Sequence, residues 1–381
     1  MSGNSEKFRL KNMSLIDEVI ENCIGCKACT KNCKMLNEYC DEPKKLMRKI
    51  KEDKEVAGII PFSCNMCDKC EQVCPRNINM GKVFMGMRQE IVDSNKGVSP
   101  INGHKAIHVH QHLGFSSYFS LGACKKRKDV KRVFLPGCSL SAYSPDLVMK
   151  TYGYLKEKLP DTAIMLQCCG QPTKSIGEEE EFKNKYKLLE DMLRESGAEE
   201  IITACQNCYK LISENSPEYK VKSLWTVIKD LGIPETAKNV GKDSDLVFSI
   251  HDACPTRYNT EIQDAIRYIV NEMGYKIEES EYSREKTICC GMGGMVLPAN
   301  KEIFDIVSGN AARNFKVDHI ITYCASCREA MVRSGKKSVH ILDLVFGGRW
   351  SRNSKFPGLP RIAIFNWVNR FKTKSMAKKE M

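Results

Sequence analysis

Short apolar stretches alternate with longer amphipathic ones over residues 131–348. The apolar stretches are rich in β-branched residues and include "RVFLP" at 132–136 and "EIIT" at 200–203. Between them lie stretches with the three-to-four spacing of a helix, such as "EFKNKYKLLEDMLRES" at 181–196. This alternation predicts α/β domains with parallel sheets and helices outside them.

The α/β part of the chain repeats itself. Three segments of its first half have counterparts in its second half: "VFLPGCSLSAY" at 133–143 and "VFSIHDACPTR" at 247–257, "MLQCCGQP" at 165–172 and "TICCGMGG" at 287–294, and "EEIITACQNCYKLI" at 199–212 and "DHIITYCASCREAM" at 318–331. Matched cysteines lie 116 to 121 residues apart. A near-constant offset indicates one structural unit used twice, so we expect one domain over 131–243 and a second over 244–348.

The N-terminal part has a helical pattern instead. "DEPKKLMRKIKEDKEVAGI" at 41–59 and "MGKVFMGMRQEIVDS" at 80–94 repeat their apolar residues every three or four positions. They predict a small helical domain over 1–97, so the fold class is an α+β multidomain chain. Residues 98–130 are expected to be an exposed linker.

The C-terminal tail, 349–381, contains "LPRIAIFNWVNRFKTKSMAKK". This segment predicts a basic amphipathic helix with Ile364, Trp367, Val368 and Phe371 on one face. Such a helix can lie on an anionic membrane surface or in a partner's groove. Packing on the protein's own body is the alternative.

Composition and charge exclude several classes. The 59 lysines and arginines exceed the 47 acidic residues, for a net charge of +12. The basic run "KKRKDVKR" at 125–132 has no interleaved aromatic residues, which favours a solvated linker over a nucleic-acid surface. The sequence contains no run of eighteen apolar residues, so no membrane span is predicted. Because "MSGNSEKFRL" lacks an export signal, we expect a cytoplasmic protein whose twenty cysteines are reduced and free to bind metal.

Two cysteine runs in the N-terminal part have identical spacing, with two, two and three residues between cysteines. They are Cys23, Cys26, Cys29 and Cys33, and Cys64, Cys67, Cys70 and Cys74. Bacterial-type ferredoxins hold two [4Fe–4S] clusters with this spacing, and the fourth cysteine of each run binds the other cluster. We therefore assign one cubane cluster to Cys23, Cys26, Cys29 and Cys74, and the other to Cys64, Cys67, Cys70 and Cys33. Zinc, which also takes four thiolates, is the alternative.

Each repeat unit adds five cysteines that follow predicted strands. They are Cys138, Cys168, Cys169, Cys205 and Cys208 in the first unit, and Cys254, Cys289, Cys290, Cys324 and Cys327 in the second. The carboxyl ends of parallel strands meet at one edge of a sheet, so these thiols should converge there. One cube needs only four thiolates, and a fifth can bridge irons, which suggests a cluster that is not a simple cube. Zinc or buried thiols are the alternative, and Cys40 and Cys124 are left over as ordinary thiols.

The pattern of Cys, Cys-Cys-Gly and Cys-x-x-Cys resembles the CCG (cysteine-rich) domain of heterodisulfide reductase catalytic subunits. A two-cluster ferredoxin domain followed by two complete CCG modules is most similar to the fused catalytic subunit of the membrane-associated heterodisulfide reductases, over residues 15 to about 345. This resemblance implies noncubane [4Fe–4S] clusters at the ten CCG cysteines, with Cys168, Cys169, Cys289 and Cys290 at the reacting centres. It also implies that the substrate is a thiol/disulfide couple.

His251 resembles a histidine that accompanies the CCG cysteine Cys254 in relatives. A neutral imidazole there can deliver a proton to a departing thiolate, or it can be a histidine that merely satisfies backbone groups at a strand end. The histidines of "HVHQH" at 108–112 are expected to lie in the exposed linker without binding metal. "CGMGG" at 290–294 lacks the spacing of a nucleotide fingerprint, so no flavin or nicotinamide site is predicted.

The resemblance implies an iron–sulfur oxidoreductase that relays electrons between ferredoxin-type cubanes and CCG clusters. Its redox partner would be a flavoprotein, a ferredoxin or a membrane cytochrome subunit, with peripheral membrane contact through the tail. CCG modules also occur in iron–sulfur subunits of glycolate and lactate oxidation systems. The alternative is therefore an electron-transfer subunit of a flavin-dependent hydroxy-acid dehydrogenase, without a substrate site of its own.

Overall fold

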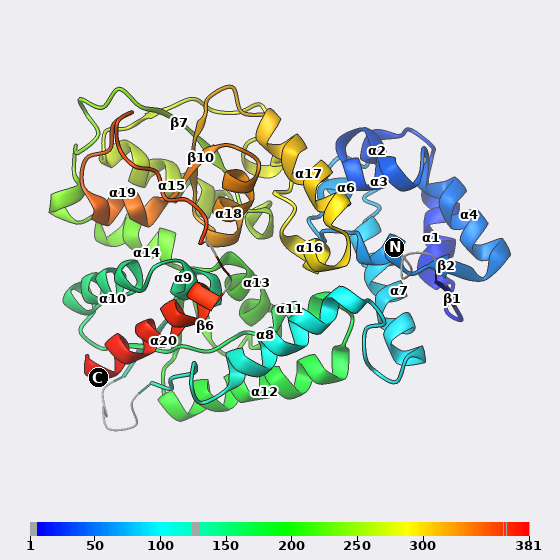
Figure 1. Ribbon diagram of the computed structural model, residues 1–381, viewed down its shortest axis with the longest axis horizontal. Coiled ribbons are helices and arrows are strands. Elements are labelled where there is room, and N and C mark those ends of the chain that lie inside the picture. Colours follow the sequence, from blue (N-terminus) through cyan, green and yellow to red (C-terminus); the bar gives the residue numbers. More distant parts are fainter. Residues whose placement is uncertain (1–5, 124–129, 361, 363, 381) are drawn as a thin grey trace.

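The structure is a computed structural model that describes residues 6–123, 130–360, 362 and 364–380 (Figure 1). Its N-terminal part is the predicted helical domain, closed by one antiparallel pair of strands, β1 (Lys7–Arg9) and β2 (Glu55–Ala57). The helices are α1 (Ser14–Asn22), α2 (Ala28–Asn32), α3 (Lys34–Tyr39), α4 (Pro43–Asp53), α5 (Ile59–Phe62), α6 (Lys69–Gln72) and α7 (Met80–Ser94). Two of the shortest helices, α2 and α6, lie inside the cysteine runs and carry the third cysteine of each.

The segment after the helical domain is more ordered than the expected exposed linker. It forms the 3-10 turn η1 (Asn102–His104) and helix α8 (Lys105–Phe115), which contacts α11 of the next domain. His104 is fully buried and its Nδ1 lies 2.7 Å from Ser99 Oγ, while His108 Nε2 lies 2.7 Å from Glu178 Oε1. The expectation of exposure is therefore wrong for His104, and also for His108 and His110, which are half-buried; His112 is exposed. The basic run expected to be solvated falls largely, with Cys124, outside the described residues.

The first α/β domain has a four-stranded parallel sheet in the order β4-β3-β5-β6 among the described residues. Its strands are β3 (Arg132–Leu135), β4 (Thr162–Ile164), β5 (Glu200–Thr203) and β6 (Lys220–Ser223). Its helices are α9 (Cys138–Tyr143), α10 (Pro145–Lys158), α11 (Gln171–Ser175), α12 (Glu179–Ser196), α13 (Gln206–Asn215) and α14 (Leu224–Leu231), followed by the turn η2 (Glu235–Ala237).

The second α/β domain repeats that topology. Its sheet has the order β8-β7-β9-β10, again parallel throughout, so each strand occupies the place of its counterpart in the first domain. The strands are β7 (Val247–His251), β8 (Lys276–Ile277), β9 (His319–Thr322) and β10 (Lys337–His340). The helices are α15 (Thr260–Glu272), α16 (Val296–Ala299), α17 (Lys301–Arg313), α18 (Ala325–Arg333) and α19 (Ile341–Gly347), with turns η3 (Cys254–Thr256), η4 (Arg284–Lys286) and η5 (Gly293–Met295). The predicted α+β fold with two repeated parallel-sheet domains is confirmed.

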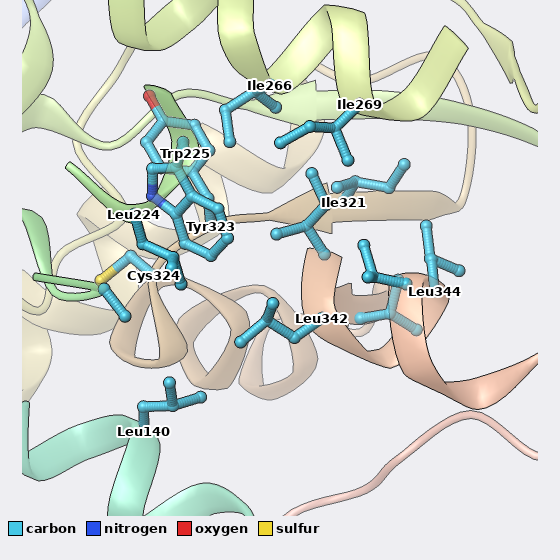
Figure 2. Close-up of a cluster of buried hydrophobic side chains, with 14 of the residues drawn as sticks. Leu140, Leu224, Trp225, Ile266, Ile269, Ile321, Tyr323, Cys324, Leu342 and Leu344 are labelled. Atoms are coloured by element: carbon cyan, nitrogen blue, oxygen red, sulfur yellow. The ribbon is translucent and has the colours of Figure 1, made fainter. Parts of the chain in front are cut away.

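One apolar core runs through both α/β domains. Trp225 of α14, fully buried, lies with its ring centroid 6.2 Å from that of Tyr323, which follows β9 of the other domain. Figure 2 shows these two rings together, with Ile266 and Ile321 beyond them and Cys324 at the edge of the cluster. Because the two domains share this core, they form one body that carries the cysteines of both.

The C-terminal segment forms helix α20 (Ile364–Lys379), which packs against α9 and α10 of the first α/β domain (Figure 1). The sequence predicts this helix, but the predicted apolar face is not the face that packs. Arg370, Thr373 and Ala377 are buried, whereas Ile364, Val368 and Phe371 are exposed. Only Trp367 of the predicted face is half-buried, with its ring centroid 4.7 Å from that of Phe119. Among the described residues, no helix is both long and apolar enough to cross a bilayer.

Candidate metal centres

The two N-terminal cysteine runs are folded in the same way. Lys27 and Asp68, which follow the second cysteine of each run, both have left-handed backbone with φ of 59° and 58°. Gly25 and Met66, which precede that cysteine, are also left-handed, with φ of 72° and 53°. These reversals turn the chain so that three thiols of a run face the same space, which helical or extended backbone would not do.

The fourth cysteine of each run lies with the other run. One cavity is lined by Cys23, Cys26, Cys29 and Cys74, and a second by Cys33, Cys64, Cys67 and Cys70. Met80 lies between the two cavities and lines both. The cysteines are therefore grouped as the crossed assignment of ligands predicts. That each group binds a cluster stays a prediction.

Burial makes four of the thiols in these cavities weaker acids. It raises the pKa of Cys29 to about 11 and that of Cys64 to about 11, and it raises the pKa of Cys33 and Cys70 further. Buried thiolates need a cation to balance them. A metal cluster is the group that four converging buried thiols fit.

The five cysteines of the second α/β domain form one connected group. Cys290 Sγ lies 3.4 Å from Cys327 Sγ, and a ring nitrogen of His251 completes a set whose ligand atoms lie within 4.8 Å of one another. Hydrogen bonds with Cys289 and Cys327 hold the pKa of Cys290 well below its usual value. Cys254 interacts with Cys289, and Cys324 with Cys327. His251, which ends β7 and is 2% exposed, therefore faces the Cys290 and Cys327 side of the group.

The five cysteines of the first α/β domain have different neighbours. Cys138 pairs with Cys168, and the hydrogen bond from Cys168 lowers the pKa of Cys138 to about 6. Cys208 interacts with Cys169 and Cys205. Strand β3 carries no histidine in its sequence, and the polar groups beside these thiols come from other elements. Gln111 of α8 has its Nε2 3.5 Å from Cys168 Sγ, and Arg370 of α20 donates from Nε to the Cys138 carbonyl at 3.3 Å.

Glycine at 137 lets this group close. Gly137 has φ of 83°, and a Cβ there would lie 2.6 Å from Cys205 Cβ. Any side chain at this position would therefore push Cys205 away from the other thiols.

The second N-terminal run lies directly against the Cys289–Cys290 loop. Cys289 lines the same cavity as Cys67, and a hydrogen bond from Cys289 lowers the pKa of Cys67 to about 7. Asn65 Nδ2 donates to the Gly291 carbonyl at 2.7 Å. A Cβ at Gly293 would lie 2.3 Å from the Asn65 carbonyl oxygen, and one at Gly294 would lie 2.1 Å from that of Cys64. Gly293 and Gly294 of "CGMGG" therefore allow the backbones of the two domains to approach closely.

Two buried arginines border the same junction. Arg88 Nη2 donates to the Cys64 carbonyl at 2.7 Å and its Nη1 to the Gly294 carbonyl at 3.0 Å, while Arg257 Nε donates to the Cys67 carbonyl at 3.0 Å. Both are at most 1% exposed, and no carboxylate of the described residues forms an ion pair with either. Their charge is balanced if the neighbouring thiols are thiolates on a metal cluster, since such a cluster is a local anion.

Sequence reasoning missed four of these residues: Arg88, Arg257, Gln111 and Arg370. None stands in a motif, and all lie at contacts between segments distant in the chain. Cys40, expected to be an ordinary thiol, is half-buried beside the first cavity, and burial raises its pKa to about 12. No signal in the sequence marked the arginines, because lysine and arginine are frequent throughout.

Comparison with known proteins matches the same three parts of the chain. Residues 22–79 match the model of the 4Fe-4S dicluster domain, and residues 133–213 and 248–331 both match that of the cysteine-rich domain.

Two relatives align over much of the chain. It is 23% identical over 365 residues to a subunit of the fumarate reductase (CoM/CoB) of Methanothermobacter marburgensis, covering 86% of this chain and 71% of that protein. It is 22% identical over 261 residues to a subunit of the dihydromethanophenazine:CoB–CoM heterodisulfide reductase of Methanosarcina barkeri, covering 61% of this chain and 62% of that protein. An aspartate racemase homologue from Pyrococcus horikoshii aligns at 12% identity over 65% of this chain and 99% of its own, with a TM-score of 0.23, too low to bear on the fold.

Proposed function

We propose that this chain, which belongs to the iron–sulfur proteins that join a 4Fe-4S dicluster domain to two cysteine-rich domains, is the iron–sulfur subunit of a disulfide reductase. It is an iron–sulfur electron-transfer protein related to subunits of CoM/CoB reductases. The types of cluster and the nature of the substrate are proposed from the geometry of the cysteines.

Eighteen cysteines would hold the metal. Two cubane clusters would bind in the N-terminal cavities, and two noncubane [4Fe–4S] clusters at the five-cysteine groups of the α/β domains. When bound, such clusters supply electrons one at a time for breaking a sulfur–sulfur bond. The reduction of a disulfide to two thiols consumes two electrons and two protons, and the reverse direction releases them.

The observation that carries the proposal is the contiguity of the four cysteine groups. Met80 joins the two N-terminal cavities, and the contact between Cys67 and Cys289 joins the second cavity to the second α/β domain. Across the domain interface, Ser139 Oγ lies 3.2 Å from Ser326 Oγ, next to Cys138 and Cys327 in the chain. The ligand groups thus form one row whose far end is the first α/β domain.

The two ends of the row differ in access. Cys26 of the first N-terminal run is exposed, so a redox partner can exchange electrons there. Within the row, a ring nitrogen of His251 lies near the sulfurs of Cys290 and Cys327, where the imidazole would deliver a proton to a departing thiolate. A pocket opens beside Cys138, where the two α/β domains meet, which favours a substrate site of its own over a pure relay for a hydroxy-acid dehydrogenase.

The exposed apolar face of α20 is a candidate contact for the partner complex or for a membrane surface. Ile364, Val368 and Phe371 are each 40% or more exposed, and lysines follow them along the helix. The relatives are subunits of larger reductases by name, which supports a protein partner.

The test is iron and acid-labile sulfide per chain on anaerobically purified protein, combined with reduction of a small disulfide by the reduced protein. About sixteen irons, four clusters of four, and disulfide reduction would support the proposal. Cys289→Ser is expected to lose one cluster and the reduction, whereas Cys40→Ser, as a matched control, keeps both. About eight irons in the unaltered protein, without disulfide reduction, would contradict it and leave the relay function.

A further inference from the structure

A pocket of about 250 Å³ lies where the two α/β domains and α20 meet. The first α/β domain contributes Cys138 and Ser139, the second contributes Ser326 and Arg328, and α20 contributes Trp367 and Arg370. None of the comparisons assigns a ligand to it. Its position beside Cys138 puts any occupant next to the thiols of the first α/β domain.

Two buried arginines in the lining have nitrogens without partners among the described residues. Arg370 is 5% exposed; its Nε donates to the Cys138 carbonyl at 3.3 Å, and its Nη1 has no hydrogen-bond partner there. Arg328 is 2% exposed; its two Nη atoms donate to the carbonyls of Pro357 and Gly358 at 2.7 and 3.0 Å, and its Nε is likewise without a partner. A buried donor without a partner costs free energy, so a ligand that accepts from it is stabilised.

Two acidic groups lie near these arginines. The Cys138 thiol, whose pKa is lowered by Cys168 and also by Arg370, lies in the lining. The Asp343 carboxylate interacts with Arg328. The carboxylate of Glu329, which also lines the pocket, is paired with Arg333 at 2.8 Å. Helix α18 begins at Ala325, so its N-terminal end with Ser326 faces the pocket and favours negative charge there. His110, another lining residue, adds no positive charge at neutral pH, because burial and then Arg370 lower its pKa to about 4.

We propose that this pocket binds the acidic group of an anionic thiol or disulfide, and that Arg370 and Arg328 recognise it. The acid is a carboxylate, sulfonate or phosphate, the groups that a guanidinium binds through charge-assisted hydrogen bonds. This inference rests on the proposed function for the sulfur chemistry, but the anion site stands on its own geometry. Arg370 is a binding residue in it, contributed by a helix outside the repeated domains.

The experiment compares a dianionic disulfide with its unreactive analogue. The disulfide is 3,3′-dithiodipropionate, and in suberate two methylene groups replace its two sulfurs, so suberate can bind but cannot be reduced. Suberate binding to the iron-loaded protein is measured by titration calorimetry, and the KM and kcat for reduction of the disulfide are measured separately. Suberamide, the neutral diamide, is the control ligand.

Suberate is expected to bind, and suberamide is not. Arg370→Gln should weaken suberate binding about 10- to 100-fold, the range for losing one charge-assisted hydrogen bond, and Arg370→Lys should restore part of it. The KM for dithiodipropionate should rise with kcat changed less. Lys372→Gln, which removes an exposed positive charge from the same helix, should leave binding unchanged.

A second variant guards against loss of fold at Arg370. Asn366→Asp adds a negative charge to the lining without changing side-chain volume, and it should weaken suberate binding with iron content unchanged. Suberate that fails to bind, or binds Arg370→Gln as tightly as the unaltered protein, would overturn the anion site. Arginine-dependent suberate binding without disulfide reduction would sustain the site and refute the proposed reductase.

Discussion

The two cysteine-rich domains have the same strand order and the same five cysteines, yet their surroundings differ. In the second, the Cys289–Cys290 loop lies against the backbone of Cys64 and Asn65, with the buried Arg88 and Arg257 around it. In the first, the equivalent loop lies against α8 and α20, which bring Gln111 and Arg370 to Cys138 and Cys168. The repeat thus supplies equivalent ligand groups, and segments outside the repeat give each group its own neighbours.

This difference suggests a division of work. The second domain places its Cys289–Cys290 loop against the dicluster domain, which suits passing electrons onward. The pocket with unpaired guanidinium donors lies between the two α/β domains and reaches Cys138 of the first, which suits binding of a substrate there. Duplication followed by divergence of the flanking segments would produce this asymmetry without altering the cysteines.

The largest effect is expected from a pair of cysteine variants that separates the two domains. Cys290→Ser and Cys169→Ser should each abolish disulfide reduction, because each removes a proposed ligand. Only Cys169→Ser should leave the second domain reducible by electrons supplied at the dicluster domain. EPR spectra recorded after limited reduction test this prediction. Equal signals from the second domain in both variants would refute the proposed order of the four cysteine groups.

The next effect concerns stability at the shared core. Trp225 of the first domain and Leu342 of the second hold equivalent positions, one residue into α14 and α19. Trp225→Ala should cost about 3–5 kcal/mol and Leu342→Ala about 2–5 kcal/mol of unfolding free energy. Because Trp225 contacts Tyr323 and His340 across the domain boundary, its loss should destabilise both domains in one transition. Denaturant unfolding of the iron-loaded variants would show two separate transitions if this view were mistaken.

A smaller effect is expected for His251, which has no counterpart on β3. His251→Gln should slow disulfide reduction about 10²-fold or more, the range for a lost general acid, and flatten the pH profile of kcat. Gln111→Ala, its control in the other domain, should slow reduction less and keep the profile. An unchanged pH profile in His251→Gln would favour the alternative, in which the imidazole only satisfies backbone groups at the end of the strand.

The smallest effect on the isolated chain is expected on the outer face of α20. Val368→Glu should change stability by no more than about 0.5 kcal/mol, because the side chain is 40% exposed. Binding of the chain to its partner complex or to anionic vesicles should weaken if this face is the contact. Thr373→Glu places a charge on the buried face of the same helix. It should therefore destabilise the chain and detach α20 from α9.

The sequence predicted what local spacing determines. Cysteine intervals fix which thiols one turn can bring together, and the 116- to 121-residue offset between matched cysteines revealed the repeat. It did not predict which face of α20 packs, because the amphipathic pattern there marks an exposed apolar face, while Arg370 and Thr373 take the buried side. Nor did it predict Arg88 or Arg257, because their partners are backbone carbonyls, which any residue type offers.

The glycine contacts at the junction have a consequence for kinetics. Gly293 and Gly294 leave no space for even a methyl group against Asn65 and Cys64, and Arg88 ties together carbonyls of Pro61, Cys64 and Gly294. The dicluster domain and the second cysteine-rich domain therefore cannot swing apart as hinged electron carriers do. Electron exchange across this contact should be independent of solvent viscosity, and its rate should be set by the chemistry at either side rather than by diffusion of one domain towards the other.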